Sequence, residues 1–217
     1  MSYELESALS LERFSRYLEW AEKDRDRALE LYSLNTRVSE SLYTPLQMLE
    51  VTLRNRIHSV MTDAMHERWF EEAGFLSVEN QRKQLSTVRV HLSNSRKELT
   101  SGQYIAALSF SFWTSMLAPN YEILWQKTLN CIAQRDDGKG LHRKQLSVPL
   151  SQIRSIRNRI AHHEPIIHLN LLYEYRNIMK VTRWLSPVAA DWSECHSRFP
   201  SVHPSERVVL AKHHKMR

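Results

Sequence analysis

Glycine is scarce in this chain, with 4 in 217 residues. A phosphate-binding P-loop or a dinucleotide-binding turn needs clustered glycines, because the backbone must approach a phosphate closely. Gly74 and Gly102 stand alone, and Gly138 with Gly140 builds neither motif. The sequence therefore excludes most kinases, nucleoside triphosphatases and Rossmann-type enzymes.

Cysteine and long apolar runs are lacking as well. Cys131 and Cys195 are the only cysteines, too few for a disulfide framework, so we expect a reducing, cytoplasmic location. No stretch of about 18 uninterrupted apolar residues occurs, which predicts that nothing spans a membrane. The first seven residues carry acids instead of a basic region followed by an apolar run, so we expect no secretory signal.

The remaining composition is that of an ordinary globular protein. Hydrophobic residues make up 42% and charged residues 25% of the chain. The formal net charge of +6 is compatible with a polyanionic partner such as RNA. A basic balance of this size is also common in proteins that touch no nucleic acid, so the charge alone does not assign a function.

Low glycine, scattered proline and apolar residues at three- and four-residue steps predict an all-α protein. We expect one domain, with a core over about residues 9–199 and a frayed basic tail over 200–217. A charged run at residues 22–27 is interpreted as a solvated face. The predicted helices are one opening at Leu9–Phe14 and capped by Ser10, a short one through Leu31, then 38–65, 78–100, 104–117, 146–163 (or from just past Pro149), 169–184 and 187–195.

Two of these predicted helices carry details that the structure can test. In the helix over 38–65, Pro45 marks either a kink or the first turn. The block over 104–117 reads as one core helix, and its aromatic residues are expected in the core rather than stacked on RNA bases. The same expectation covers the tryptophans outside this block. The aromatic residues concerned are Phe110, Phe112, Trp113, Trp125, Trp184 and Trp192.

The segment from Leu146 to Pro165 concentrates positive charge on an amphipathic helix. Its apolar residues fall within about one third of the circumference, and Arg157 lies in that same arc. An arginine facing a core is costly unless it is paired or meets a polar interface. With Arg154 and Arg159 it forms a cluster that has no acid until Glu164, and such a cluster favours an anion. The apolar residues are Leu146, Leu150, Ile153, Ile156 and Ile160.

Pro165 predicts the end of this helix, with His162 and His163 in or near its last turn. On an ideal helix Arg157 and His162 point about 140° apart. They converge on one phosphate only if the last turn loosens or if two copies of the helix face each other. The second route makes a site shared across a homodimer an attractive hypothesis.

The pattern Arg157-Asn158-x-x-x-His162 resembles the R-N-x-x-x-H form of the HEPN motif. The longer string from Ile156 to Ile166 resembles the signature of abortive-infection (Abi) proteins of the AbiD/AbiF type. Further family landmarks occur in the expected order, so the resemblance covers roughly residues 9–199. These landmarks are Leu31-Tyr32-x-x-Asn35, Leu49-Glu50-Val51-x-Leu53-Arg54-Asn55, Ser109-Phe110-x-Phe112-Trp113 and Trp184 to Trp192.

The resemblance implies a HEPN-like helical bundle with additional N- and C-terminal helices, no cofactor, and a homodimer. It implies a metal-independent endoribonuclease that acts as a toxin in antiviral defence, with an RNA or protein antitoxin as a candidate partner. In this chemistry the ribose 2′-hydroxyl attacks the adjacent phosphate. His162 suits acid/base catalysis, Arg157 suits transition-state stabilisation, and Asn158 suits orientation or binding of ribose or phosphate. His163 and Glu164, with Arg159 and Arg154, are interpreted as supporting or RNA-binding residues.

Alternatives to catalysis stay open at this point. Arg157 and His162 also fit a structural arginine and a histidine that interacts with the helix dipole. The chain also fits a non-catalytic RNA-binding or scaffolding HEPN module. A metal site at His162 to Glu164 is disfavoured, since adjacent helical residues diverge and no further ligand pattern completes a shell.

The helix over 38–65 carries a second candidate group of polar residues. Glu50, Arg54 and His58 form one row at four-residue steps, and Asn55 adjoins it. This row is either an intrahelical ion pair with a surface histidine, or a second wall of the cleft. In the second case Glu50 and Arg54 hold Arg157 or RNA phosphates.

Overall fold

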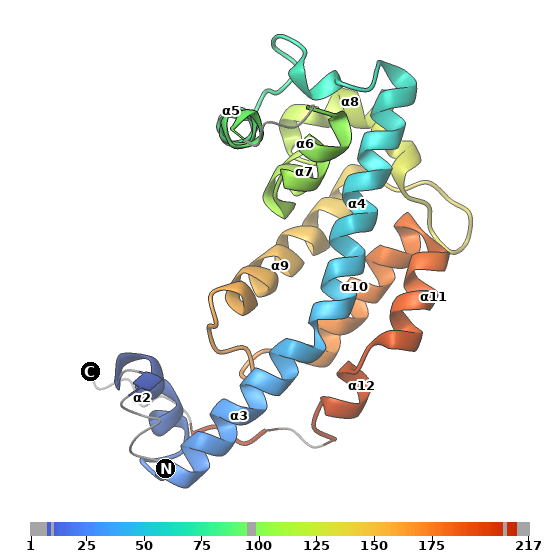
Figure 1. Ribbon diagram of the computed structural model, residues 1–217. Coiled ribbons are helices and arrows are strands. Elements are labelled where there is room, and N and C mark those ends of the chain that lie inside the picture. Colours follow the sequence, from blue (N-terminus) through green and yellow to red (C-terminus); the bar gives the residue numbers. More distant parts are fainter. Residues whose placement is uncertain (1–7, 10, 95–98, 206–207, 212–217) are drawn as a thin grey trace. The chain divides into compact units, whose positions relative to one another are not determined.

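The computed structural model describes residues 8–9, 11–94, 99–205 and 208–211, and within these ranges every regular element is helical (Figure 1). The predicted all-α class is confirmed. The α-helices are α2 (Leu11–Trp20), α3 (Arg25–Ser41), α4 (Tyr43–Ala64), α5 (Glu79–Ser93), α6 (Ser101–Ala107), α7 (Phe110–Ser115), α8 (Glu122–Lys127), α9 (Arg143–Ala161), α10 (Leu171–Leu185), α11 (Pro187–His196) and α12 (Phe199–Val202), and the 3-10 helices are η1 (Trp69–Glu71), η2 (Pro119–Tyr121) and η3 (Leu129–Ile132).

The chain divides into two compact units, each assembled from separate stretches of sequence. The first unit comprises Met1–Tyr43, Ile156–Tyr175 and Ser197–Arg217. The second comprises Thr44–Ser155 and Arg176–His196. The end of α9, with the Arg157-Asn158-x-x-x-His162 motif, therefore belongs to the first unit.

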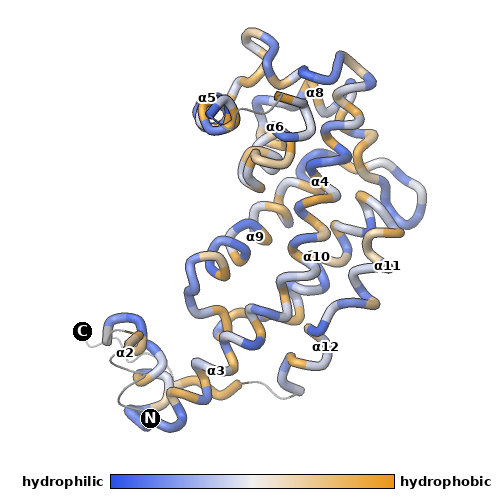
Figure 2. Tube along the Cα trace, viewed as in Figure 1, coloured by the Kyte–Doolittle hydropathy of each residue, from blue (hydrophilic) through white to orange (hydrophobic). Residues whose placement is uncertain are grey.

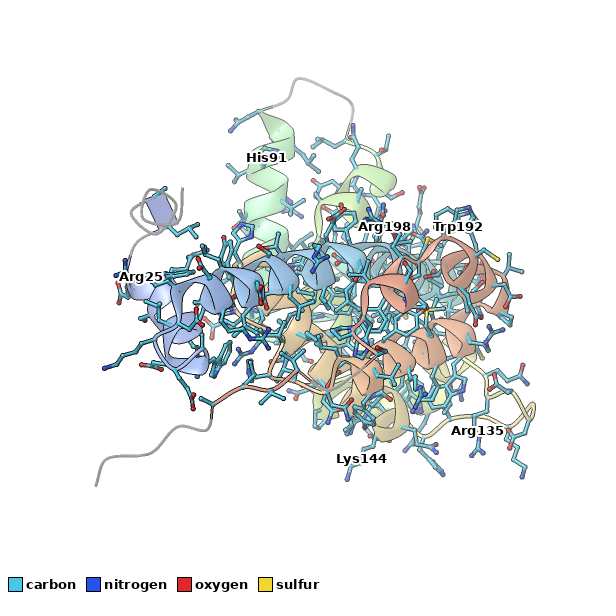
Figure 3. The ribbon with its side chains drawn as sticks, turned by 90° about the horizontal axis from the view of Figure 1, so that it is seen from below. Arg25, His91, Arg135, Lys144, Trp192 and Arg198 are labelled. Atoms are coloured by element: carbon cyan, nitrogen blue, oxygen red, sulfur yellow. The ribbon has the colours of Figure 1, made fainter. Side chains whose placement is uncertain are left out.

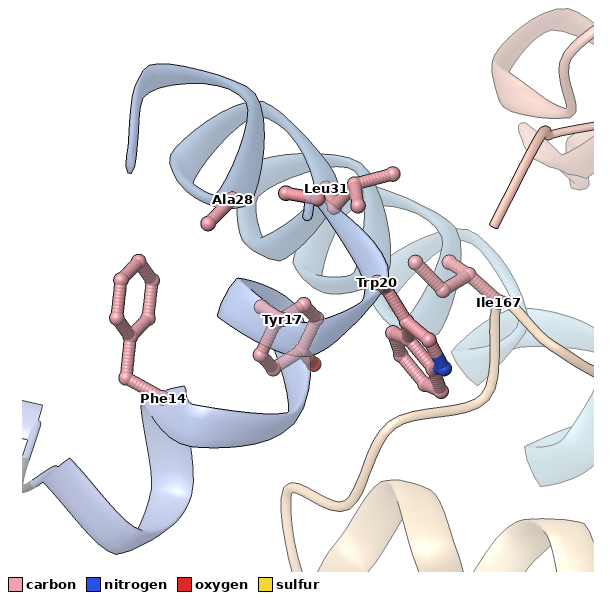
Figure 4. Packing of buried hydrophobic residues seen from close by; sticks show 7 residues of the cluster. Phe14, Tyr17, Trp20, Ala28, Leu31 and Ile167 are labelled. Atoms are coloured by element: carbon pink, nitrogen blue, oxygen red, sulfur yellow. The ribbon is translucent and has the colours of Figure 1, made fainter. Parts of the chain in front are cut away.

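The core of the first unit joins α2, α3 and the loop that follows α9 (Figure 4). Tyr17 and Trp20 of α2 pack edge to face, with ring centroids 5.6 Å apart. Leu31 of α3 and Ile167 of the loop belong to the same buried cluster. Burial of large apolar side chains is the main stabilising term in such a core, at about 1.5–3 kcal/mol for each. The loop after α9 is thus packed onto the N-terminal helices.

The core of the second unit is built on α4 and rich in aromatic residues. The buried stripe of α4 follows the expected three- and four-residue steps. Trp69 and Trp113 are fully buried and lie edge to face at 6.4 Å. Phe110, Phe112, Trp113 and Trp125 are all at most 3% exposed, which confirms their predicted place in the core. The stripe consists of Leu46, Leu49, Leu53, Ile57 and Met61.

The helix predicted over 38–65 begins at Tyr43, because the helix is interrupted at Leu42, between α3 and α4. Pro45 lies in the first turn of α4, where the N–H groups have no intrahelical acceptor. Of the two readings of Pro45, the first turn is therefore the correct one. Helix α3 also runs ten residues beyond the predicted end at Leu31, with Asp24 accepting from the Arg27 N–H at its start.

The prediction of a single helix over 104–117 was wrong. Leu108 and Ser109 adopt extended backbone conformations and separate α6 from α7. The break places the Leu108 carbonyl oxygen 3.3 Å from the buried Trp113 indole N–H, which donates to it. Packing of a large side chain with one polar atom thus overrides the local helical pattern.

The prediction that Trp192 lies in the core was also wrong. Trp192 lies on α11 (Figure 3) and is 48% exposed. Its ring stacks on that of His196, with ring centroids 4.2 Å apart. Trp184 is half-buried. Neither tryptophan therefore sits in the core as expected. The stack of Trp192 and His196, residues at i and i+4 of one helix, covers one face of each ring.

The chain after Pro200 is more ordered than predicted over the described part. Phe199–Val202 forms α12, which packs on α3, and the Ala211 N–H donates to the Trp20 carbonyl oxygen at 3.1 Å. The predicted cap Ser10 and the basic end 212–217 lie outside the described residues.

Cys131 and Cys195 are both free thiols. Hydrophobic and hydrophilic residues alternate along the helices (Figure 2). None of the helices in the described ranges combines the length and apolar composition that crossing a membrane requires.

Candidate functional site

Helix α9 carries the motif, and its apolar stripe is buried as predicted. Leu146, Leu150, Ile153 and Ile156 are at most 2% exposed, and Ile160 is half-buried. The helix starts at Arg143, earlier than either predicted start, so Pro149 lies inside it. This stripe sets which residues at the C-terminal end of α9 remain open to solvent.

The end of α9 is a Schellman motif. The His163 N–H donates to the Ile160 carbonyl oxygen at 3.0 Å, and the Glu164 N–H donates to the Arg159 carbonyl oxygen at 2.8 Å. His163 has a φ of +56°, the left-handed conformation that this motif requires and that usually selects glycine. The carbonyl groups of Arg159 and Ile160 are thereby satisfied, and the chain turns sharply toward Pro165.

This turn leaves several polar side chains of the motif exposed. Asn158, His162, His163 and Glu164 are exposed, and Arg157 is half-buried. The end of α9 therefore presents two imidazoles, an amide and a carboxylate within seven residues, beside arginine side chains. These groups provide acid/base, hydrogen-bonding and anion-binding chemistry on one short stretch.

Arg159 links the two sides of the turn. Its Nη1 donates to the Pro165 carbonyl oxygen at 3.3 Å and lies 3.6 Å from a carboxylate oxygen of Glu164. Arg159 and Glu164, both predicted as supporting or RNA-binding residues, thus contact each other. Both are partly solvent-exposed, so the ion pair contributes at most about 1 kcal/mol. Its geometric effect is to close the turn.

Arg157 and His162 keep their helical separation. The His162 N–H donates to the Asn158 carbonyl oxygen at 2.9 Å, so the regular pattern continues through this residue. Five helical steps place the two positions about 140° apart around the axis. Of the two predicted routes to convergence, a last turn loosened before His162 is not observed. A site shared by two copies of the helix stays a prediction.

Arg154 belongs to the second unit, where it has a partner of its own. Its Nη1 lies 3.3 Å from Thr114 Oγ1 of α7, and its side chain is half-buried. The hydroxyl group accepts this hydrogen bond but carries no charge that could pair with the guanidinium. The prediction that Arg154 supports RNA binding is neither strengthened nor removed by this contact.

Glu50, Arg54 and Asn55 lie on α4, also in the second unit. Glu50 and Arg54 are half-buried and Asn55 is exposed. The Arg54 Nε is buried and has no hydrogen-bond partner among the described residues. Their predicted place as a second wall of the cleft stays a prediction.

His58 is not the surface histidine that one reading of this row proposed. Its Nδ1 accepts a hydrogen bond from the Trp69 indole N–H at 3.2 Å, and its side chain is half-buried. Burial lowers the pKa of His58, and the charge of Glu67 opposes that shift. A neutral imidazole that accepts from a core tryptophan has a structural role.

Two residues beside the motif were not assigned to the site from the sequence. Asn35 of α3 accepts the backbone N–H groups of Ile166 and Ile167, which follow the turn. The His168 ring lies 5.5 Å from Trp20, and burial, Arg159 and Arg16 lower its pKa. The signal for Asn35 was available: it is a polar residue on the buried stripe of α3.

The first unit also contains a pocket of about 840 Å³. Its lining comes from Leu34 and Val38 of α3, residues 167–172, and parts of the chain between His203 and Leu210. The lining is largely apolar, and none of residues 154–164 contributes to it. The candidate site is therefore the exposed end of α9 and not this pocket.

Among the described residues, no three histidine, cysteine, aspartate or glutamate side chains gather into a group able to hold a metal ion. Comparison with known proteins finds no matching family model, no matching curated protein and no matching solved structure. The residues and geometry of the site are therefore the basis for any functional assignment.

Proposed function

We propose that this protein is a metal-independent endoribonuclease of the HEPN type that acts as a toxin in phage defence. The observation that carries the proposal is the end of α9, where His162 and Asn158 are exposed beside Arg157. A titratable ring, an amide and a guanidinium on one helix end supply the groups that phosphodiester cleavage through a ribose 2′-hydroxyl needs.

The roles follow from the chemistry of each group. His162 accepts the proton of the 2′-hydroxyl or donates one to the leaving 5′-oxygen, since an imidazole titrates near neutral pH. Arg157 stabilises the charge on the crowded phosphate with its planar fork of N–H donors. Asn158 binds ribose or phosphate through its amide. The products are a 2′,3′-cyclic phosphate and a 5′-hydroxyl.

The separation of Arg157 and His162 favours a composite site. About 140° around one helix axis prevents both side chains from reaching one phosphate from the same face. In a twofold-symmetric dimer, each α9 helix faces its copy, and Arg157 of one protomer meets His162 of the other. The proposal therefore includes a homodimer as the active form.

The direct test is RNA cleavage by the purified protein in EDTA. We expect cleavage by the wild type and a loss of at least about 100-fold in rate for His162→Ala and for Arg157→Ala. His91→Ala is the matched control, because His91 is also an exposed histidine in the last turn of a helix, α5. The control should cleave at the wild-type rate.

Measurements of RNA binding and of bacterial growth distinguish a ribonuclease from a non-catalytic scaffold. We expect His162→Ala to bind RNA as the wild type does, to fold normally, and to remove toxicity in a bacterial host. Binding without cleavage by the wild type would identify an RNA-binding module instead. Equal toxicity of His162→Ala and the wild type would remove His162 from catalysis.

A further inference from the structure

Asn35 makes a long-range contact that the proposed chemistry does not itself use. Its side chain is 5% exposed, and its Oδ1 accepts the Ile166 N–H at 2.7 Å and the Ile167 N–H at 3.3 Å. Asn35 and Ile166 are 131 residues apart in the sequence. Both N–H donors belong to buried residues, and a buried donor without a partner is costly, so one amide oxygen satisfies two donors of the loop.

The four residues from His162 to Pro165 are therefore held at both ends. At the start, the His162 N–H bonds to the Asn158 carbonyl oxygen within α9. At the end, Asn35 holds Ile166, and Ile167 is buried in the cluster formed by α2 and α3 (Figure 4). A short segment with two fixed ends has few conformations available to it.

We infer that Asn35 is a positioning residue of the site. Through Asn35, helix α3 helps to hold the turn that follows His162. This inference rests on the proposed ribonuclease function. Asn35 acts through the backbone of Ile166 and Ile167 and not on RNA. When the amide oxygen is lost, the turn after His162 gains freedom, and the backbone that carries the imidazole is held less closely. A displacement of about 1 Å in such a group lowers a rate about 100-fold.

The first measurement is hydrogen exchange of the Ile166 and Ile167 amides, followed by NMR. We expect at least about fivefold faster exchange in Asn35→Ala, since the hydrogen bond contributes roughly 1 kcal/mol. Asn35→Asp keeps an oxygen acceptor at the same place and should retain slow exchange. Ser41→Ala is the control, because Ser41 is a buried residue of the same helix whose hydroxyl donates to the Val38 carbonyl oxygen within the first unit.

The second measurement is RNA cleavage by the same variants. Asn35→Ala should lower kcat about tenfold or more while KM changes less than about threefold, because RNA binding does not involve Asn35. The pH profile should keep its shape, since the titrating groups are unchanged. Asn35→Asp and Ser41→Ala should stay within about threefold of the wild type. If Asn35→Ala fails to fold, Asn35→Ser replaces it, because the serine hydroxyl ends one atom short of the amide oxygen.

The possible results are distinguishable. Faster exchange with a reduced kcat, both restored in Asn35→Asp, supports the inference. Unchanged exchange in Asn35→Ala, or fast exchange with a wild-type kcat, overturns it while the ribonuclease function stands. A wild-type protein that does not cleave RNA overturns the proposed function and the positioning role with it.

Discussion

Glu164 folds back on Arg159 at the end of α9: its N–H donates to the Arg159 carbonyl oxygen at 2.8 Å, and its carboxylate lies 3.6 Å from the Arg159 guanidinium. This return of the chain is possible because His163, between them, adopts a φ of +56°. A non-glycine residue in this conformation carries a steric cost. His163 therefore places an imidazole at a position where glycine would carry the lower steric cost.

Replacing His163 by glycine should stabilise the fold. Glycine relieves the strain at positive φ, and its greater freedom in the unfolded chain offsets part of the gain, so we expect about 0.5 kcal/mol in the free energy of unfolding. Ala161→Gly, at the end of the same helix, should instead destabilise by about 0.5–1 kcal/mol. Urea denaturation measures both, and a less stable His163→Gly protein would contradict this account of the turn.

Two inactive variants should complement each other if the site is shared by two protomers. In a mixed dimer of Arg157→Ala and His162→Ala, one of the two sites combines an intact arginine with an intact histidine. Random mixing makes half of the dimers mixed, so the mixture should recover roughly a quarter of wild-type cleavage. A mixture as inactive as its components would place both groups of each site in one chain.

The stability of the fold should decrease as the pH falls below about 6.5, the ordinary pKa of histidine. Burial lowers the pKa of His58 and of His168, so the folded protein binds protons less readily than the unfolded chain at these residues. Their contribution is complete above the unfolded pKa and is lost as the pH falls through it, because the unfolded state then gains the protons. Thermal unfolding at pH 8 to 5 measures this dependence.

His58→Asn isolates one part of that dependence. The asparagine oxygen replaces Nδ1 as acceptor for the Trp69 indole N–H and does not titrate, so the pH slope should become shallower. His91→Asn, at an exposed residue of α5, is the control for the loss of a histidine elsewhere in the chain. An equal slope in wild type and His58→Asn would exclude His58 as a source.

Glu174→Gln should stabilise the protein at neutral pH. Burial raises the pKa of Glu174, and its Oε2 has no hydrogen-bond partner among the described residues. A raised pKa means that the folded state disfavours the charged carboxylate, so the cost is present above the folded pKa and disappears as the pH falls below about 4.3. The free energies of unfolding should differ at pH 7 and converge at pH 3, and a difference that persists at pH 3 would point to another cause.

Much of the fold could be predicted because it depends on local periodicity. The stripe from Leu146 to Ile156 and the place of Pro45 in the first turn of α4 follow from helix geometry and from the missing proline N–H. The break at Leu108 could not be predicted in this way. It depends on the partner that the Trp113 indole finds, which belongs to packing and not to spacing.

The candidate site likewise combines features that the sequence predicted with features that it did not. The residue types of the motif, their order and the stop before Pro165 are properties of the sequence alone, since they depend on neighbours a few positions away. The left-handed turn at His163 and the stack of Trp192 on His196 are local features that the pattern did not predict, whereas tertiary structure decided that Asn35 holds the loop from 131 residues away. The Asn35 contact arises because buried N–H groups must find acceptors wherever the packed chain supplies them, and no local pattern specifies that partner.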